Sequence, residues 1–203
     1  MSKVVVFTNL TLDGVMQAPG RPDEDRRGGF EHGGWATPYA AMAQAGNSMA
    51  NTSALLLGRR TYEDFYTVWP NRTDNPYTAV LNNIQKYVAS TTLSEPLSWS
   101  NSTLLKGDAA EAVARLKEEP GKDLVVMGSG ELVQSLMRHN LVDEYVLLIH
   151  PLVLGSGRRL FADGGAFAAL RLVDTKTTTT GVVIATYQPT EQTARKTTDA
   201  VTH

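Results

Sequence analysis

The sequence predicts an α/β sandwich in which helices flank a mixed β-sheet. Two observations lead to this prediction. Short continuous runs of Val, Leu and Ile alternate with segments that carry helix signals, and such runs are typical of strands covered on both faces. The last third of the chain instead holds two adjoining segments that alternate between apolar and polar residues, which indicates an antiparallel hairpin at a sheet edge.

The predicted strands follow one another along the chain at short intervals. Six of them are runs rich in Val, Leu and Ile, at Lys3–Thr8, Ala54–Leu57, Lys86–Ala89, Thr103–Leu105, Asp123–Met127 and Glu144–Ile149. The closing hairpin is predicted over Leu170–Thr179 and Val182–Gln188, with its turn around Gly181.

Two of the segments between strands begin with helix-start signals. Asn75 followed by Pro76 is typical of an N-cap and a first helical residue, and it predicts a helix over Tyr77–Ile84. Asp108 with Glu111 three residues later has the spacing of a capping box and predicts a second helix start. Strands that alternate with helices and end in a hairpin indicate one α/β layer structure.

Length and composition predict one domain. The chain has 203 residues, of which 42% are hydrophobic, which is enough for a single large core. We assign residues 1–189 to this domain and residues 190–203 to a C-terminal tail, because the tail lacks apolar periodicity. A net charge of −2 argues against a nucleic-acid or anionic-membrane binder, since both need a strong positive field.

Several kinds of site are excluded by residue content. The chain has no cysteine, so disulfides, thiolate chemistry, Fe–S clusters and cysteine-ligated zinc are excluded. The four histidines are scattered without metal-ligand spacing, and no metal site is predicted. No G-x-S-x-G elbow supports a hydrolase triad. No apolar run reaches the ~20 residues of a membrane span, and no signal peptide is recognised at the start, so we expect a cytoplasmic protein.

A glycine and two arginines follow the predicted strand Ala54–Leu57. Gly58-Arg59-Arg60-Thr61 would open a helix, where arginine is slightly unfavourable because the helix dipole is positive there. An anion held by the backbone N–H groups and the arginines would remove that conflict. The alternative is a glycine turn with two solvated arginines.

A second junction of this type is Gly128-Ser129-Gly130, after the strand Asp123–Met127. A helix is predicted from about Ser129, because Leu132 and its apolar neighbours share one face. Glycines here permit a close backbone approach to a pyrophosphate, although one such motif on its own is more often a structural tight turn. Two strand–glycine–helix junctions in one sheet are more informative, since both can face one extended diphosphate ligand.

Three further segments carry weaker signals. Leu12-Asp13-Gly14 is either a common Asp-Gly turn or a carboxylate placed at a strand end to bind a polar substrate. Gly20–Gly34 is polar, glycine-rich and too long for a simple connection, so it is predicted to be functional or mobile. Trp35 beside it is a packing anchor or a pocket wall. Gly155-Ser156-Gly157-Arg158-Arg159 is a flexible turn or a phosphate site.

Taken in order, these motifs resemble the dihydrofolate-reductase-like fold. More closely, they resemble the reductase domain of bifunctional riboflavin-biosynthesis enzymes and its stand-alone bacterial relatives. The resemblance spans Lys3 to about Gln188. Its segments are Leu12-Asp13-Gly14, Gly58-Arg59-Arg60-Thr61-Tyr62-Glu63, Lys86–Thr91, Met127-Gly128-Ser129-Gly130-Glu131-Leu132, Leu141–Tyr145 and Pro151–Phe161.

The resemblance implies a three-layer sandwich with a mostly parallel sheet and a nicotinamide dinucleotide across the carboxyl ends of its strands. It implies that Asp13 is the catalytic residue, with Gly14 and Trp35 beside it on the substrate side. The cofactor-binding residues that it implies are Gly58, Arg59, Arg60, Thr61, Ser90, Thr91, Gly128, Ser129, Gly130, Glu131 and Leu132. The implied activity is NADPH-dependent hydride transfer of the 5-amino-6-(5-phosphoribosylamino)uracil reductase type.

Two departures from the family patterns narrow this expectation. Folate reductases share a W-x-x-P-x-D/E stretch, but the segment starting at Trp35 ends in Ala40, which cannot ionise, so folate reduction is disfavoured. The family often has Ser-Arg where this chain has Ser90-Thr91, which weakens the expected contact with the adenosine ribose phosphate. No H-x-E…P-C-x-x-C deaminase motif is present.

Two other functions stay open at this stage. A non-catalytic protein on the same fold would capture a small ligand without turnover. A Rossmann-type dehydrogenase is the weaker alternative, because no glycine fingerprint follows the first strand. In either case the partner is a small molecule rather than nucleic acid or a membrane. A homodimer is expected through the threonine-rich edges of the hairpin Leu170–Gln188.

Overall fold

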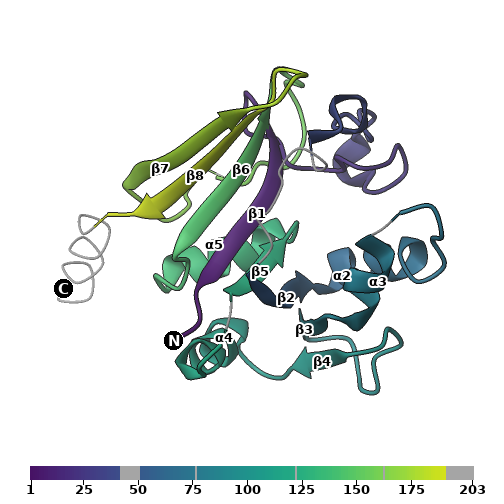
Figure 1. Ribbon diagram of the computed structural model, residues 1–203, viewed down its shortest axis with the longest axis vertical. Helices are drawn as coiled ribbons and strands as arrows, with labels where there is room; N and C mark the ends of the chain where they lie inside the picture. Colours follow the sequence, from purple (N-terminus) through teal and green to yellow (C-terminus); the bar gives the residue numbers. More distant parts are fainter. Residues whose placement is uncertain (42–50, 76, 122, 162, 191–203) are drawn as a thin grey trace.

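The fold is described by a computed structural model for residues 1–41, 51–75, 77–121, 123–161 and 163–190. Eight strands form one sheet in the order β4-β3-β2-β5-β1-β6-β8-β7. Their bounds are β1 (Val4–Thr11), β2 (Thr52–Gly58), β3 (Gln85–Ala89), β4 (Ser102–Leu105), β5 (Asp123–Met127), β6 (Glu144–His150), β7 (Leu170–Thr177) and β8 (Val183–Pro189). Figure 1 shows β4 and the hairpin β7–β8 at opposite ends of this sheet.

The described helices connect these strands. They are α2 (Arg59–Val68), α3 (Tyr77–Asn83), α4 (Ala109–Glu118) and α5 (Gly130–Arg138), with two 3-10 turns, η1 (Arg27–Gly29) and η2 (Thr37–Tyr39), in the long β1–β2 connection. No helix among these described residues is long and apolar enough to cross a membrane. Of the predicted tail, residues 191–203 lie outside the described residues.

The six predicted apolar strands and the hairpin are confirmed, with small differences in length. β1 to β6 pair in parallel, whereas β8 is antiparallel to both β6 and β7. β1 continues three residues beyond the predicted end at Thr8, because Asn9, Leu10 and Thr11 pair with the last residues of β6. Tertiary pairing here outweighs the polar character of Asn9.

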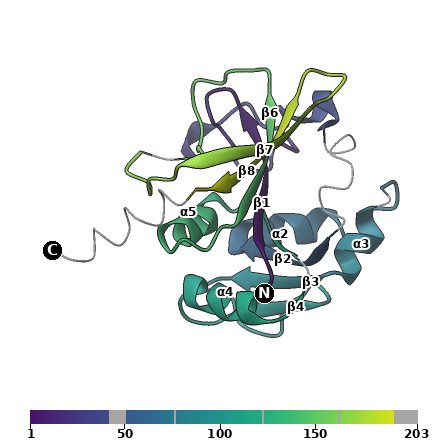
Figure 2. The same cartoon turned by 60° about the vertical axis from the view of Figure 1, so that its left-hand side comes forward.

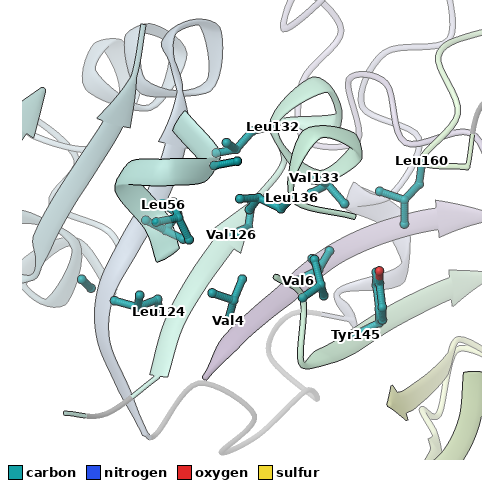
Figure 3. Close-up of a cluster of buried hydrophobic side chains, with 14 of the residues drawn as sticks. Val4, Val6, Leu56, Leu124, Val126, Leu132, Val133, Leu136, Tyr145 and Leu160 are labelled. Carbon is teal, nitrogen blue, oxygen red and sulfur yellow. The ribbon is translucent and has the colours of Figure 1, made fainter. Parts of the chain in front are cut away.

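Both faces of the sheet are covered, as the continuous apolar runs predict. In β1, Val4 and Val6 face the layer of α4 and α5, while Val5 and Phe7 face the layer of α2 and α3. Figure 2 shows α4 and α5 on one side of β1 and α2 and α3 on the other. Leu132, Val133 and Leu136 of α5 point onto the sheet in Figure 3. This is the three-layer sandwich expected from the sequence.

The predicted helix-start signals act as expected. The Asp108 side chain accepts a hydrogen bond from the Glu111 N–H at the start of α4, 3.0 Å away. The Asn75 Oδ1 accepts one from the Tyr77 N–H at the start of α3, 2.9 Å away. Pro76, the predicted first helical residue, lies outside the described residues.

The parallel order of β1 to β6 decides where functional side chains meet. The carboxyl ends of all six strands lie at one edge of the sheet, and ligands of open α/β sheets bind at such an edge. The candidate site motifs lie in or directly beside the connections that follow β1, β2, β3, β5 and β6, with Trp35 further along the β1–β2 connection.

Candidate functional site

The two strand–glycine–helix junctions lie side by side and are hydrogen-bonded to each other. They follow the neighbouring strands β2 and β5. The Gly58 N–H donates to Ser129 Oγ at 2.8 Å, and that hydroxyl donates to Thr61 Oγ1 at 2.9 Å. One serine side chain therefore ties the N-terminus of α2 to that of α5.

The backbone at the second junction has an unusual conformation. Gly128 and Ser129 are both left-handed, with φ of 56° and 57°. A Cβ on Gly128 would lie 3.2 Å from Thr61 Oγ1, and one on Gly130 would lie 2.8 Å from Met16 Sδ. Glycine is favoured at Gly128 by its left-handed φ and by this contact, whereas a side chain at position 130 would only require the flexible Met16 side chain to move. The Ser129 side chain gives α5 no N-terminal cap, so the first N–H groups of that helix are available to an anion.

Arginines surround the two helix starts. Arg59 pairs with Glu63 of the same helix at 3.0 Å, whereas Arg60 lies 3.8 Å from Glu131 in the first turn of α5. Arg158, from the loop after β6, lies 3.3 Å from the same glutamate. Leu132 can offer only its backbone to a ligand at this site, because its side chain is buried against the sheet. The sequence indicated Arg158 only weakly and gave no specific signal for Arg27.

Arg27 extends from the glycine-rich loop Gly20–Gly34 toward Glu131, and the buried side-chain amide of Gln17 positions it. The Gln17 Nε2 donates to the carbonyls of Asp25 and Arg27, at 3.2 and 3.0 Å. The Gln17 Oε1 accepts a hydrogen bond from the Arg158 N–H at 2.9 Å. Gln17 is buried, so it fixes the two loops that carry Arg27 and Arg158 relative to each other.

The glycine-rich loop is also held to α2. Arg21 forms a bidentate ion pair with Asp64 of that helix. The Glu24 carboxylate accepts hydrogen bonds from the N–H groups of Gly20 and Arg21, at 2.6 and 3.1 Å, and burial raises its pKa. These contacts give the long loop a defined course beside the two junctions.

Ser90 and Thr91 lie one strand further out. Gly58 pairs with Ala89 at the end of β3, so Ser90 follows directly beside the start of α2. The Ser90 hydroxyl accepts hydrogen bonds from the N–H groups of Thr92 and Leu93, at 3.1 and 3.0 Å. Ser90 and Thr91 line a cavity of about 550 Å³ that Lys106, at the end of β4, also lines. Sequence reasoning missed this lysine.

Asp13 is held by several groups of its own chain. Its Oδ1 accepts from the Thr11 hydroxyl at 2.6 Å and from the Leu154 N–H at 3.2 Å, and its Oδ2 accepts from the Gly155 N–H at 2.9 Å. The Thr11 hydrogen bond, with those from the two backbone groups, lowers the Asp13 pKa to about 2. An ionised carboxylate of this kind is an acceptor and cannot supply a proton near neutral pH.

Gly14 and Trp35, both expected on the substrate side, have different surroundings in the structure. Gly14 turns the chain with φ of 79° and precedes Val15. Trp35 is 8% exposed and packs in a cluster with Val15, Ala18 and Phe30. Its Nε1 donates to the Gln17 carbonyl at 2.7 Å. The structure therefore places Trp35 as a packing anchor, which was one of the two interpretations of the sequence.

The comparison with protein families gives a match over nearly the whole chain. Residues 2–184 match the RibD C-terminal domain. Two curated relatives from Bacillus subtilis (strain 168) are each 33% identical. The uncharacterized protein YwjB matches over 86% of this chain and 91% of its own length, and the uncharacterized protein YyaP over 66% and 72%.

Solved structures share the fold at low sequence identity. A candidate riboflavin biosynthesis protein from Shewanella sp. PV-4 has a TM-score of 0.66 at 21% identity, covering 93% of this chain and 99% of its own. A pyrimidine reductase-like protein from Corynebacterium diphtheriae has 0.61 at 11%, covering 93% and 92%. Dihydrofolate reductase from Enterococcus faecalis, complexed with NADP(H), has 0.59 at 14%, covering 92% and 96%. The expected dihydrofolate-reductase-like fold is confirmed.

Proposed function

The chain belongs to the RibD C-terminal domain family, a reductase-type family, and we propose that it is an NADPH-dependent reductase of the riboflavin-biosynthesis type. Its substrate would be a small heterocyclic or sugar-linked compound with a C=N or C=O carbon. The observation that carries the proposal is the Ser129 hydroxyl linking the two helix N-termini beside Arg60. Through this hydroxyl, the Gly58 and Gly128 junctions would form one continuous anion-binding surface.

The residues present fit a dinucleotide. The backbone of Gly128 to Gly130 and the uncapped start of α5 suit a diphosphate, because N–H groups and the helix dipole both favour negative charge. Arg59, Ser90 and Thr91 would hold the adenosine ribose and its phosphate, at the ends of β2 and β3. When bound, NADPH supplies the hydride, and the chain supplies orientation and electrostatics.

The substrate end would lie near Asp13, after β1. Since the Asp13 pKa is about 2, its carboxylate stays ionised and would orient a substrate donor group rather than protonate it. When the C=N or C=O carbon accepts the hydride, the nitrogen or oxygen bonded to it gains a proton, and that proton would then come from water. Gly14, on the same turn, leaves space beside this carboxylate because it has no side chain.

The cofactor assignment predicts a preference for NADPH over NADH. A 2′-phosphate adds nearly two negative charges, and a well-formed arginine contact contributes about 1.5–3 kcal/mol. We expect NADPH to bind about tenfold to a hundredfold more tightly than NADH. Arg59→Ala should remove most of the difference, whereas Arg171→Ala on β7 should leave it unchanged. Calorimetric dissociation constants measure both, and equal constants in the unmodified protein would disprove the ribose-phosphate assignment.

One observation favours a second candidate function, a non-catalytic ligand-binding protein. Both oxygens of the proposed catalytic carboxylate, Asp13, are already engaged by Thr11, Leu154 and Gly155. Stopped-flow oxidation of bound NADPH with candidate heterocyclic and sugar-linked substrates separates the two functions. A reductase gives repeated turnover, whereas a binding protein gives saturation of binding without any loss of NADPH absorbance.

A further inference from the structure

Three guanidinium groups from three distant segments converge on one exposed carboxylate oxygen. The Glu131 Oε1 lies 3.3 Å from Arg158, 3.8 Å from Arg60 and 4.0 Å from Arg27. The Glu131 side chain is 76% exposed. The arginines come from the loop after β6, the first turn of α2 and the β1–β2 loop.

A surface salt-bridge network is the simpler explanation, but the charges do not balance. Asp25 already pairs with Arg27, so three guanidinium groups and the positive end of α5 face two carboxylates, which leaves an excess of about one positive charge besides that of the helix end. Exposed pairs contribute only about 0.2–1 kcal/mol each, so Glu131 gains little from the arrangement. Like charges this close repel one another, and an anion with two or more charges would relieve that repulsion better than a carboxylate.

Two features show that the cluster is built rather than accidental. The Arg27 guanidinium donates to Asp25 through Nε and Nη2, but its buried Nη1, 4.0 Å from Glu131, forms no hydrogen bond with any other described residue. Such a donor is costly to bury unpaired, and a bound anion would satisfy it. The buried Gln17 also fixes the loops of Arg27 and Arg158 to each other, so these two arginines are held together before any ligand binds.

We propose that Arg27, Arg60 and Arg158 form a diphosphate-binding site, and that Glu131 occupies it in the ligand-free protein as an internal competitor. The occupant is the diphosphate of the dinucleotide, so this inference rests on the proposed cofactor. Binding displaces the exposed Glu131 side chain from the arginines. Glu131 therefore sets the affinity of the site and discriminates against anions with a single charge, which gain too little to displace it.

The test measures binding of inorganic pyrophosphate and of NADPH by calorimetry. Glu131→Gln should tighten both about threefold to thirtyfold, because it removes the competing charge and keeps the side-chain size. The affinity for acetate, which has one charge, should rise by the largest factor relative to the unmodified protein. Glu111→Gln is the matched control, since Glu111 also lies in the first turn of a helix and has no arginine within ion-pair distance among the described residues. It should change neither affinity.

The arginines are tested in the opposite direction. Arg158→Gln should weaken pyrophosphate binding about tenfold in the Glu131→Gln background and by less in the unmodified chain, where Glu131 already neutralises part of the charge. Arg171→Gln on β7 should have no effect. Thermal unfolding of each variant establishes that the fold is intact, and Glu131→Ala repeats the measurement with a smaller side chain.

The outcomes separate this inference from the proposed function. If Glu131→Gln weakens or leaves unchanged the binding of pyrophosphate, the competitor role is wrong, whatever the cofactor is. If pyrophosphate follows the expected pattern but NADPH does not bind, the anion site stands and the cofactor proposal fails. Ribose 5-phosphate serves as a third ligand. Tight binding of this ester at the arginines, without competition from NADPH, would overturn the assignment to the cofactor diphosphate.

Discussion

At the residue scale, Asp13 joins two loops at the carboxyl edge of the sheet. Its low pKa means that the ionised form stabilises the fold at every pH above about 3.8, and that this contribution is lost as the pH falls through about 2. We expect Asp13→Asn to lower the free energy of unfolding at pH 7 by about 1–3 kcal/mol, because an amide nitrogen would face the N–H of Gly155 or Leu154. Urea denaturation at pH 7 and pH 3 measures this.

The same variant tests the substrate role of Asp13. As the control for the stability measurement, Asp163→Asn at an exposed position should leave the free energy of unfolding unchanged at pH 7 and at pH 3. If Asp13 orients substrate, turnover per folded molecule should fall at least about tenfold in Asp13→Asn, with NADPH affinity nearly unchanged. Full specific activity in a destabilised variant would assign Asp13 to the turn alone.

His150 provides a second prediction at this scale. It is fully buried at the end of β6, with its ring edge-on to Trp35 and Tyr39. Its Nδ1 donates to the Leu148 carbonyl at 2.9 Å, while its Nε2 has no hydrogen-bond partner among the described residues. Burial lowers the His150 pKa, although the backbone hydrogen bonds partly oppose this shift. The neutral ring is the folded form.

The sign of the pH dependence follows from that shift. Below the unfolded pKa of about 6.5, the unfolded chain binds a proton that the folded chain does not, so stability falls with decreasing pH. Between pH 7.5 and 5.5 the unmodified protein should lose about 1 kcal/mol more than His150→Gln, which keeps an N–H donor but does not titrate. Urea denaturation at the two pH values checks this, and parallel losses would contradict it.

At the element scale, a buried lysine in the second position of β3 caps the C-terminal end of α3. Lys86 of β3 is fully buried, and its Nζ donates to the carbonyls of Leu81 and Ile84 at 2.7 Å. The ammonium also lies 4.5 Å from the centre of the Trp99 ring. These acceptors lie at the C-terminal end of α3, where a positive charge is favourable. Burial nevertheless lowers the Lys86 pKa to about 8.

Replacing this lysine should therefore weaken the connection of α3 to the sheet. Lys86→Met keeps the apolar stem but removes the Nζ donor from the Leu81 and Ile84 carbonyls, and we expect a loss of about 2 kcal/mol. For a chain of this size that corresponds to a fall in Tm of about 4–8 °C. Lys106→Met, at an exposed position directly after β4, is the control and should change Tm by little. Equal values for both variants would contradict the capping role.

At the scale of the whole molecule, the hairpin β7–β8 leaves apolar residues exposed at one edge of the sheet. In β7, Leu172 and Val173 are 49% and 45% exposed, and Val183 of β8 is 36% exposed. Exposed apolar edge strands are liable to pair with another chain unless they are covered. We propose that a second copy covers them, which makes the protein a homodimer.

Light scattering tests this proposal. The expected mass at micromolar concentration is twice the 22.0 kDa of the chain. Val173→Lys should shift the mass toward that of the monomer, because it places a charge in the proposed interface. Val80→Lys on α3, another exposed apolar position, should not. A mass near 22.0 kDa for the unmodified protein would disprove the homodimer.

Local sequence patterns were sufficient to predict the strands, the helix starts and the α/β class. The central strands β1, β2, β5 and β6 were identifiable because they are largely buried on both faces, which requires a continuous apolar run, whereas β3 and β4 are only partly buried. The helix starts at Asn75 and Asp108 were identifiable because a side-chain cap acts on a backbone group only two or three residues away. The glycines of both junctions were identifiable for the same local reason, since they mark tight turns between a strand and a helix.

Which of these local features act together depends on contacts between residues far apart in the chain, and these became visible in the folded structure. Ser129 lies 71 residues from Gly58, and Gln17 lies 141 residues from Arg158. Arg27 belongs to a loop without sequence periodicity, so nothing local distinguishes it from a solvated arginine. Lys86 and His150 appeared as ordinary members of predicted strands. Hydrogen bonds and ion pairs depend on distance in space, and that distance is fixed by the order of strands in the sheet, which local propensity does not encode.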